Sequence, residues 1–246
     1  MLNIVLPMAG KGSRFAEKGY AFPKPLIEIK KKPMIQVVVE NLTPNTSHRF
    51  IFICQKNHYE QYALRYLLES IAPGCKIVLT DGITEGAACT VLLAKEFMDN
   101  DDDLIVANSD QYVDLDINDF VNHARNSGNA GCIMTFDALH PKWSFAKTGE
   151  SNLVTEVAEK KPISRHATVG IYYYKHGKYF VQGAEQMIAK DVRTNNEFYV
   201  CPIYNEIIAV PLPVGIYEID ASKMHGLGTP EDLERFMVSS VFDRVG

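Results

Sequence analysis

The chain has 246 residues, of which 46% are hydrophobic, and a formal net charge of −5. These values are typical of a globular protein with a sizeable core, and the acidic balance without a basic stripe argues against nucleic-acid binding. No run approaches the roughly 18 apolar residues of a membrane helix, and the N-terminus lacks the pattern of a signal peptide. We therefore expect no nucleic-acid partner and no membrane partner.

The first half alternates short apolar strands with helical patterns. Strands are predicted at residues 4–6, 49–54, 76–80 and 103–107, and helices at residues 33–42, 58–70 and 87–98. This alternation indicates βαβ units and a mostly parallel sheet. Such a sheet binds ligands beyond the carboxyl ends of its strands.

The second half has glycine and asparagine turns between its strands, which favours a mixed sheet. Strands are predicted at residues 130–136, 154–159, 168–174 and 214–219, and helices at residues 178–191 and 230–241. We find no repeat, linker or low-complexity segment, so one continuous domain is predicted over residues 1–246. Its class is α/β, with a central mixed, mostly parallel sheet flanked by helices.

The cysteines are far apart and form no C-x-x-C pair; they are Cys54, Cys75, Cys89, Cys132 and Cys201. This spacing argues against a zinc site or a disulfide framework. We expect a protein of the reducing cytoplasm whose cysteines are small core residues.

A short glycine loop follows the first predicted strand; Lys11 lies between its two glycines, and Arg14 lies two residues after the second. A second cationic turn follows at Lys24. Glycine has no Cβ, so backbone N–H groups can line an anion nest, and the lysine and arginine side chains add full charges. The segment lacks the ending of a Walker A loop, and Phe15 stands where a dinucleotide fingerprint needs its third glycine. The two segments together predict a polyphosphate site.

Four segments then occur in a specific order. They are PMAGKGSRF with PKPL, TEGAACTVLLA, VANSDQYVD, and EKKPIS followed by VGIYYY and LGTPEDLERF. Together they resemble the sugar-1-phosphate nucleotidyltransferases, or nucleoside-diphosphate-sugar pyrophosphorylases, over about residues 2–236. The resemblance implies a Rossmann-like GT-A nucleotidyltransferase fold whose N-terminal half binds the nucleotide and whose C-terminal half binds the acceptor. It also implies Mg²⁺-dependent transfer of a nucleoside monophosphate from a nucleoside triphosphate to a phosphorylated acceptor, in a chain that can form homo-oligomers.

The resemblance assigns catalytic roles at the phosphates to Arg14 and Lys24, and a metal-binding role to Asp110. A carboxylate suits Mg²⁺, which takes one or two carboxylates besides phosphates and waters. Asp81 could accept a hydrogen bond from cytosine, uracil or thymine, so CTP, UTP and dTTP remain open. The implied nucleotide-binding residues are Met8, Ala9, Gly10, Gly12, Ser13, Asp81, Gly86, Ala87 and Ser109.

On the acceptor side, Glu159, Lys160 and Lys161 resemble a Glu-Lys-Pro element, and the extra lysine leaves its register open. The polar and aromatic segment 195–205 suits sugar hydroxyls, but also a phosphoamino acid or a choline-like group. The implied acceptor-binding residues are Glu159, Lys160, Lys161, Gly170, Glu197, Tyr199, Tyr204 and Asn205.

The chain departs from the pattern near its C-terminus. Gly226 stands where many relatives have an aspartate as a second metal ligand, and Asp220 and His225 are the weaker substitutes. The leading interpretation is an enzyme that uses a sugar 1-phosphate. The PMAGKGSRF opening resembles members of bacterial surface-polysaccharide pathways, some of which are cytidylyltransferases with non-sugar acceptors. The alternatives are a cytidylyltransferase with a non-sugar phospho-acceptor and an inactive nucleotide-binding regulator.

Overall fold

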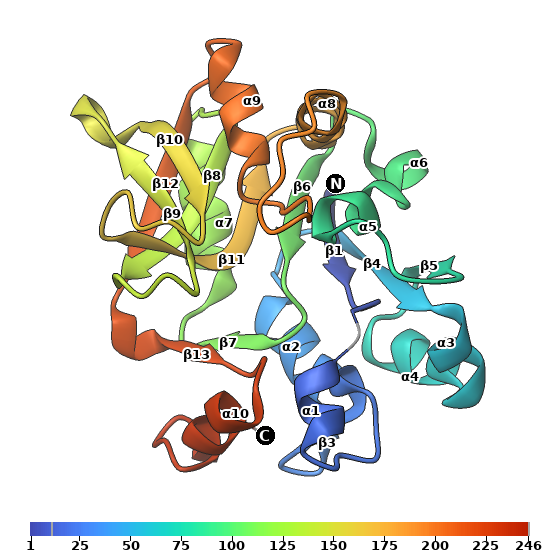
Figure 1. The fold of residues 1–246 in the computed structure, drawn as a ribbon. Coiled ribbons are helices and arrows are strands. Elements are labelled where there is room, and N and C mark those ends of the chain that lie inside the picture. The colour runs from blue at the N-terminus through green and yellow to red at the C-terminus, as the bar shows by residue number, and fades with distance from the viewer. Residues whose placement is uncertain (11, 246) are drawn as a thin grey trace.

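In the part of the chain that the computed structural model describes, residues 1–10 and 12–245, nine strands form one mixed sheet (Figure 1). Most of it follows the order β10-β9-β11-β6-β1-β4-β5, and β8 continues from β11 to β12. The parallel part consists of β1 (Leu2–Pro7), β4 (His48–Gln55), β5 (Lys76–Thr80) and β6 (Asp103–Ala107). The remaining strands are β8 (Gly131–Asp137), β9 (Ser144–Thr148), β10 (Val154–Glu159), β11 (His166–Tyr174) and β12 (Val214–Ile219).

Strand β11 is the seam between the two halves of the sheet. It runs antiparallel to β6 on one side and antiparallel to β8 on the other, whereas β12 runs parallel to β8. Strands β9 and β10 form an antiparallel pair beyond β11. The predicted α/β class with a central mixed sheet is confirmed.

Helices cover both faces of this sheet. Along β1, Ile4 and Leu6 lie in one buried cluster and Val5 lies in the other, as the alternation of side chains in a strand requires. The first cluster contains α2 (Met34–Leu42), α4 (Leu64–Ile71), α7 (Ile117–Asn126) and α10 (Pro230–Met237). The second contains α5 (Ala87–Leu92), α6 (Lys95–Met98), α8 (Gly177–Ala189) and α9 (Ile203–Ala209).

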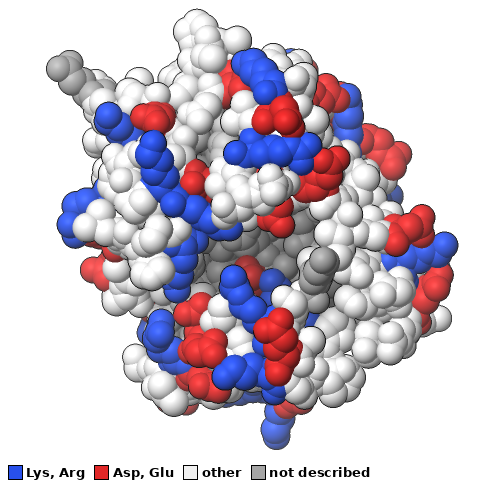
Figure 2. Space-filling model, in the orientation of Figure 1, with Lys and Arg blue, Asp and Glu red and all other residues white. Residues whose placement is uncertain are grey.

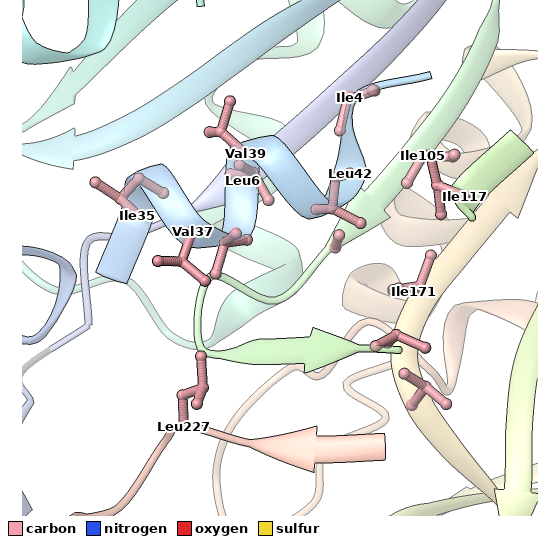
Figure 3. Close-up of a cluster of buried hydrophobic side chains, with 14 of the residues drawn as sticks. Ile4, Leu6, Ile35, Val37, Val39, Leu42, Ile105, Ile117, Ile171 and Leu227 are labelled. Carbon is pink, nitrogen blue, oxygen red and sulfur yellow. The ribbon is translucent and has the colours of Figure 1, made fainter. Parts of the chain in front are cut away.

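Helix α2 illustrates how the core is built. Six of its residues are buried, and Figure 3 shows Val39 next to Leu6 of β1 and Leu42 next to Ile4. Burying one such side chain contributes about 1.5–3 kcal/mol. The helix therefore anchors the N-terminal strand from which the glycine loop emerges.

Smaller elements surround the main sheet. Among the described residues, two short sheets pair β2 (Glu28–Ile29) with β3 (Lys32–Pro33), and β7 (Gln111–Val113) with β13 (Met224–Gly226). The remaining helices are α1 (Ser13–Glu17) and α3 (Lys56–Gln61), with 3₁₀ turns η1 (Lys24–Leu26), η2 (Glu150–Asn152), η3 (Ala221–Lys223) and η4 (Phe242–Arg244). No helix in the described part of the chain is both long and apolar enough to cross a lipid bilayer.

Two predicted helices are each broken into two. The predicted helix 58–70 falls on α3 and α4, because Ala63 between them has a φ of 49° in the left-handed region. The predicted helix 87–98 consists of α5 and α6. Helix α7 was not predicted, although Asp116 caps it by accepting a hydrogen bond from the backbone of Asn118 at 2.9 Å.

A backbone contact joins the segment before α5 to the segment before α9. The amide of Phe198 donates to the carbonyl of Glu85 at 2.8 Å, and the amide of Ala88 donates to the carbonyl of Phe198 at 2.9 Å. Gly86 between them has a φ of 136°, and a Cβ there would lie 2.4 Å from the carbonyl oxygen of Phe198. Arg193 lies over the Phe198 ring at 4.0 Å and pairs with Glu85 at 2.6 Å. Only glycine therefore allows this contact, which we call the Gly86–Phe198 link.

We predict that Gly86→Ala lowers the free energy of unfolding by about 2 kcal/mol or more, because it adds both backbone strain and a clash with Phe198. Urea denaturation would measure the change. Gly82→Ala is the matched control, since no heavy atom lies within 4 Å of the added Cβ there. Equal stability of the two variants would contradict the prediction.

Candidate functional site

Two cavities of about 580 Å³ each meet beyond the carboxyl ends of β1 and β6. Figure 2 shows this face of the molecule hollowed near its centre, with lysine and arginine side chains beside the hollow. The residues that line both cavities are Arg14, Ala87, Asn108, Asp110 and Gly228. We name the first the nucleotide cavity and the second the acceptor cavity, after the residues predicted for each.

The register of two parallel strands brings the two predicted loops together. Val5 of β1 pairs with Val106 of β6, so both strands end at the same edge of the sheet. The hydroxyl of Ser109 then donates to the carbonyl of Pro7 at 3.1 Å. The prediction that the glycine loop and Asp110 both follow strand ends is confirmed.

The glycine loop is shaped by backbone conformation and by one side chain. Gly12 has a φ of 61° and caps α1, and a Cβ there would lie 3.5 Å from Cβ of Lys24. The amide group of Gln55 donates to the carbonyl of Ala9 at 2.8 Å. The loop and the Lys24 turn therefore form one wall of the nucleotide cavity. Lys11, which the sequence assigned to the same cation cluster, lies outside the described residues.

An ion pair stands where the two cavities meet. The ammonium of Lys24 donates to Oδ2 of Asp110 at 2.7 Å, and the two side chains are 22% and 26% exposed. A Cβ on Gly228 would lie 2.7 Å from the same oxygen, so glycine leaves room for the carboxylate. The amide of Leu227 donates to the backbone carbonyl of Asp110 at 2.8 Å and holds this residue in place.

Asp110 fits a magnesium ion that is also bound by substrate phosphates. Its carboxylate is a hard oxygen donor, and Mg²⁺ takes one or two carboxylates and keeps several waters. Among residues 1–10 and 12–245, no three His, Cys, Asp or Glu side chains converge enough to hold a metal by themselves. Any ion bound here would therefore take most of its ligands from other oxygen atoms, such as waters or phosphates.

Neither of the two weaker metal candidates, Asp220 and His225, lines the cavities that Asp110 lines. Asp220 is exposed and accepts hydrogen bonds from the amide of Ser222 at 2.8 Å and from its hydroxyl at 2.6 Å. His225 packs between the rings of Tyr112 and Phe236, and burial lowers its pKa.

The acceptor cavity contains a buried carboxyl group. The hydroxyl of Ser144 donates to Glu159, and burial is the main reason why the pKa of Glu159 is raised. Thr168 and Tyr172 line the same cavity with their hydroxyl oxygens 2.9 Å apart, and burial also raises the pKa of Tyr172. This wall offers hydrogen-bonding groups to a polar ligand.

Lys160 occupies the acceptor cavity and Lys161 does not. The Lys160 ammonium donates to the hydroxyl of Tyr199 at 2.6 Å and lies 4.6 Å from the centre of its ring. Lys161 is exposed and lines neither cavity. The structure thus favours Lys160 in the register that the sequence left open.

Gly170 keeps β11 close to the loop that follows β6. It has a φ of 91°, and its carbonyl accepts from the amide of Asn108 at 2.9 Å and from the side chain of Gln111 at 3.2 Å. A Cβ on Gly170 would lie 2.2 Å from Nδ2 of Asn108. The wall shared by the two cavities depends on this close approach.

Most other predicted residues line one cavity or the other. Those in the nucleotide cavity are Ala9, Gly10, Gly12, Ser13, Arg14, Lys24, Gly86, Ala87, Ser109, Asp110 and Glu197. Met8 is buried in the core, and the Asp81 side chain is 91% exposed and 3.7 Å from Lys56, so neither reaches the cavity. The geometry therefore does not favour a nucleotide contact by either side chain.

Two predicted acceptor residues belong to the interior. Tyr204 is fully buried, stacks on Tyr174 at 4.8 Å and donates its hydroxyl hydrogen to the carbonyl of Tyr173 at 2.8 Å. The side-chain amide of Asn205 bonds both the amide and the carbonyl of Val157 at 2.9 Å. The polar groups of both side chains are thus engaged within the protein, and the geometry does not favour an acceptor role for either.

Several cavity residues were missed by the sequence reasoning; they are Thr84, Thr90, Asn108, Lys142, Trp143, Ser144, Thr168, Tyr172 and Asp232. Asn108 and Asp232 lie within the segments VANSD and LGTPEDLERF, which marked them as neighbours of functional residues. Trp143 is the only tryptophan in the sequence, and this rarity is a signal that could have marked it as a candidate site residue. Lys142 carries no local signal.

Comparison with known proteins places this geometry in a family. A profile of the nucleotidyl transferase family matches residues 3–203. The bifunctional protein GlmU of Methanocaldococcus jannaschii is 25% identical over 184 residues, which are 70% of this chain and 40% of that protein. The chain therefore spans less than half the length of that relative.

Solved structures share the whole fold. The nucleoside-diphosphate-sugar pyrophosphorylase from Vibrio cholerae RC9 has a TM-score of 0.82 and 25% identity, over 96% of this chain and 100% of that one. The inositol-1-phosphate CTP transferase from T. maritima has a TM-score of 0.74 over 99% of this chain and 94% of that one, and its 12% identity limits the likeness to the fold. Since the family profile covers most of its length, the chain belongs to the nucleotidyl transferase family.

Proposed function

We propose that this chain catalyses Mg²⁺-dependent transfer of a nucleoside monophosphate from CTP, UTP or dTTP to a phosphorylated acceptor, with release of pyrophosphate. The first candidate acceptor is a sugar 1-phosphate, in the synthesis of surface-polysaccharide precursors in the cytoplasm. One observation carries the proposal: Arg14 and Asp110 line both cavities, so the phosphates of two substrates would meet beside them.

The reaction needs positioning more than covalent chemistry. An oxygen of the acceptor phosphate attacks the α-phosphorus in line, and pyrophosphate leaves on the opposite side. The chain must hold two anions together and stabilise the charge that develops on the departing oxygen. Two unit charges about 4 Å apart cost roughly 1 kcal/mol in water and about 4 kcal/mol at an effective dielectric of 20.

Arg14 and Lys24 would offset this repulsion. Lys24 is bound to Asp110 and lines the nucleotide cavity, so its ammonium can contact a phosphate by a small movement. Backbone groups of Gly10 and Gly12 would approach the phosphates closely, because no Cβ intervenes. Asp110 would hold Mg²⁺, which neutralises phosphate charge when it is bound.

Glu159, Lys160 and Tyr199 would orient the acceptor. They line one cavity, and the segment that carries Tyr199 continues from Glu197 in the nucleotide cavity. A polar group of the acceptor could donate to Glu159, as the hydroxyl of Ser144 does.

The test is pyrophosphate release with Mg²⁺, using each of CTP, UTP, dTTP, ATP and GTP against sugar 1-phosphates, phosphoamino acids and phosphocholine. Release with one pair identifies both substrates. Tight binding of a triphosphate without release by any pair would favour the inactive regulator instead.

Asp110→Asn should lower the rate of pyrophosphate release more than tenfold, a loss above about 1.4 kcal/mol, because the amide cannot replace a charged ligand. The melting temperature should stay close to that of the wild type. Asp119→Asn makes the same change at an exposed position of α7 and serves as control. More than a tenth of the wild-type rate in Asp110→Asn would rule out the metal assignment.

Glu159→Gln tests the buried carboxyl group through pH. The folded-state pKa of Glu159 is raised by burial, so the folded state binds this proton more tightly than the unfolded state does. The contribution of the Glu159 carboxyl group to the free energy of unfolding is full below its unfolded-state pKa of about 4.3. This contribution is lost as the pH rises through its folded-state pKa. The variant should therefore gain stability relative to the wild type between pH 4 and pH 7 in urea denaturation.

The matched control is Glu234→Gln, which removes the same charge at an exposed position of α10. If the difference in free energy of unfolding between the wild type and Glu159→Gln stays constant over this pH range, the carboxyl group ionises alike in the folded and unfolded states.

A further inference from the structure

Lys142 and Trp143 form an arm over the acceptor cavity, opposite Asp232 of α10. The Lys142 ammonium lies 3.5 Å from Oδ1 of Asp232 and 4.5 Å from the centre of the Trp143 ring. The carbonyl of Trp143 accepts from the amide of Lys160 at 3.0 Å, and its ring packs edge-on against Phe136 at 5.2 Å. The backbone of this segment is thus held by Lys160, while the Lys142 side chain extends to Asp232 on the other side of the cavity.

Asp232 is the more firmly held member of this pair. Its amide donates to the hydroxyl of Thr229 at 3.1 Å in the first turn of α10, and a Cβ on Gly226 would lie 3.5 Å from its carboxylate. The Asp232 side chain is 17% exposed, whereas that of Lys142 is 43% exposed. Their contact is at the upper limit of hydrogen-bond length, so a stronger anion could displace the carboxylate.

Of the residues that the structure describes, Arg14, Lys142 and Lys160 are the cations that line the acceptor cavity, and Lys142 is the one opposite α10. Asp110, Glu159 and Asp232 all line the cavity, and a terminal phosphate adds about two negative charges. The ammonium of Lys160 is engaged with Tyr199 at 2.6 Å, whereas that of Lys142 has only its long contact and the tryptophan face.

Given the proposed function, on which this inference rests, we propose that Lys142 is a ligand of the acceptor's phosphate. On binding, its ammonium exchanges the carboxylate of Asp232 for the phosphate, and Trp143 forms the adjoining wall. Asp232 is then the partner of Lys142 in the empty cavity and competes with the phosphate for its ammonium.

A purely structural tie between the arm and α10 makes a different prediction. If the pair served only to hold the two segments together, Lys142→Met and Asp232→Asn would have the same effect on ligand binding. If Lys142 binds phosphate, removal of the lysine weakens binding, whereas removal of its competing carboxylate leaves binding unchanged or strengthens it.

The fluorescence of Trp143 reports on this cavity directly, since the chain has one tryptophan. We would titrate the full chain with inorganic phosphate and with glucose 1-phosphate at constant ionic strength, with glucose as the uncharged reference. Lys142→Met should raise the half-saturating concentration about tenfold, as expected for the loss of one charge-assisted contact. Lys142→Arg keeps the positive charge and should retain most of the wild-type affinity. Lys147→Met, an exposed lysine on β9 that lines neither cavity, should titrate like the wild type.

Equal half-saturation of wild type and Lys142→Met would overturn the inference, as would a response to glucose equal to that to glucose 1-phosphate. Equal weakening by Asp232→Asn would show a structural tie. Pyrophosphate release separates this inference from the proposed function. If the enzyme turns over and the KM for the acceptor is the same in Lys142→Met as in the wild type, Lys142 is not a phosphate ligand, and the proposed function still holds. If the titration depends on Lys142 but no substrate pair gives turnover, the proposed function is contradicted, and the role of Lys142 still holds.

Discussion

The hydrogen bond from the amide of Asn108 to the carbonyl of Gly170 joins the two halves of this protein. It extends the antiparallel pairing of β6 with β11 by one residue, at the edge where the parallel strand β1 also ends. The glycine loop comes from the parallel half, and Glu159 and Lys160 come from the antiparallel half. Because β6 pairs with β1 on one side and with β11 on the other, the loop that follows it, with Asn108 and Asp110, lines both cavities.

An acidic chain can bind two phosphorylated molecules only if its cations are local. Under the proposed function, two lysine–carboxylate pairs would supply part of this charge, Lys24 with Asp110 and Lys142 with Asp232. In such a pair the lysine is already partly dehydrated and oriented, so a bound phosphate replaces one anionic partner with another. The arrangement keeps the unliganded cavities close to electrical balance, which limits self-repulsion in the empty state.

Sequence reasoning succeeded where the determinants are local. The alternation of strands and helices, the glycine loop and the strand end before Asp110 follow from short patterns of residues. It is least informative where orientation or distant contacts decide: Tyr204 and Asn205 lie in a polar, aromatic segment, but α9 directs the tyrosine side chain into the core. Asp220 and Asp232 are both carboxylates near the C-terminus, and only the path of the chain through β13 and α10 brings the latter to the acceptor cavity.

Under the proposed function, the Gly86–Phe198 link would make binding of the nucleotide and binding of the acceptor interdependent. The strand-like contact ties the loop at the base of the nucleotide cavity to the segment that carries Glu197 and Tyr199. A change in that segment that suits a new acceptor also moves the loop beside the nucleotide. Donor and acceptor preference therefore cannot be redesigned as separate modules in this scaffold, and a graft of acceptor residues from a relative would have to carry both partners of the link.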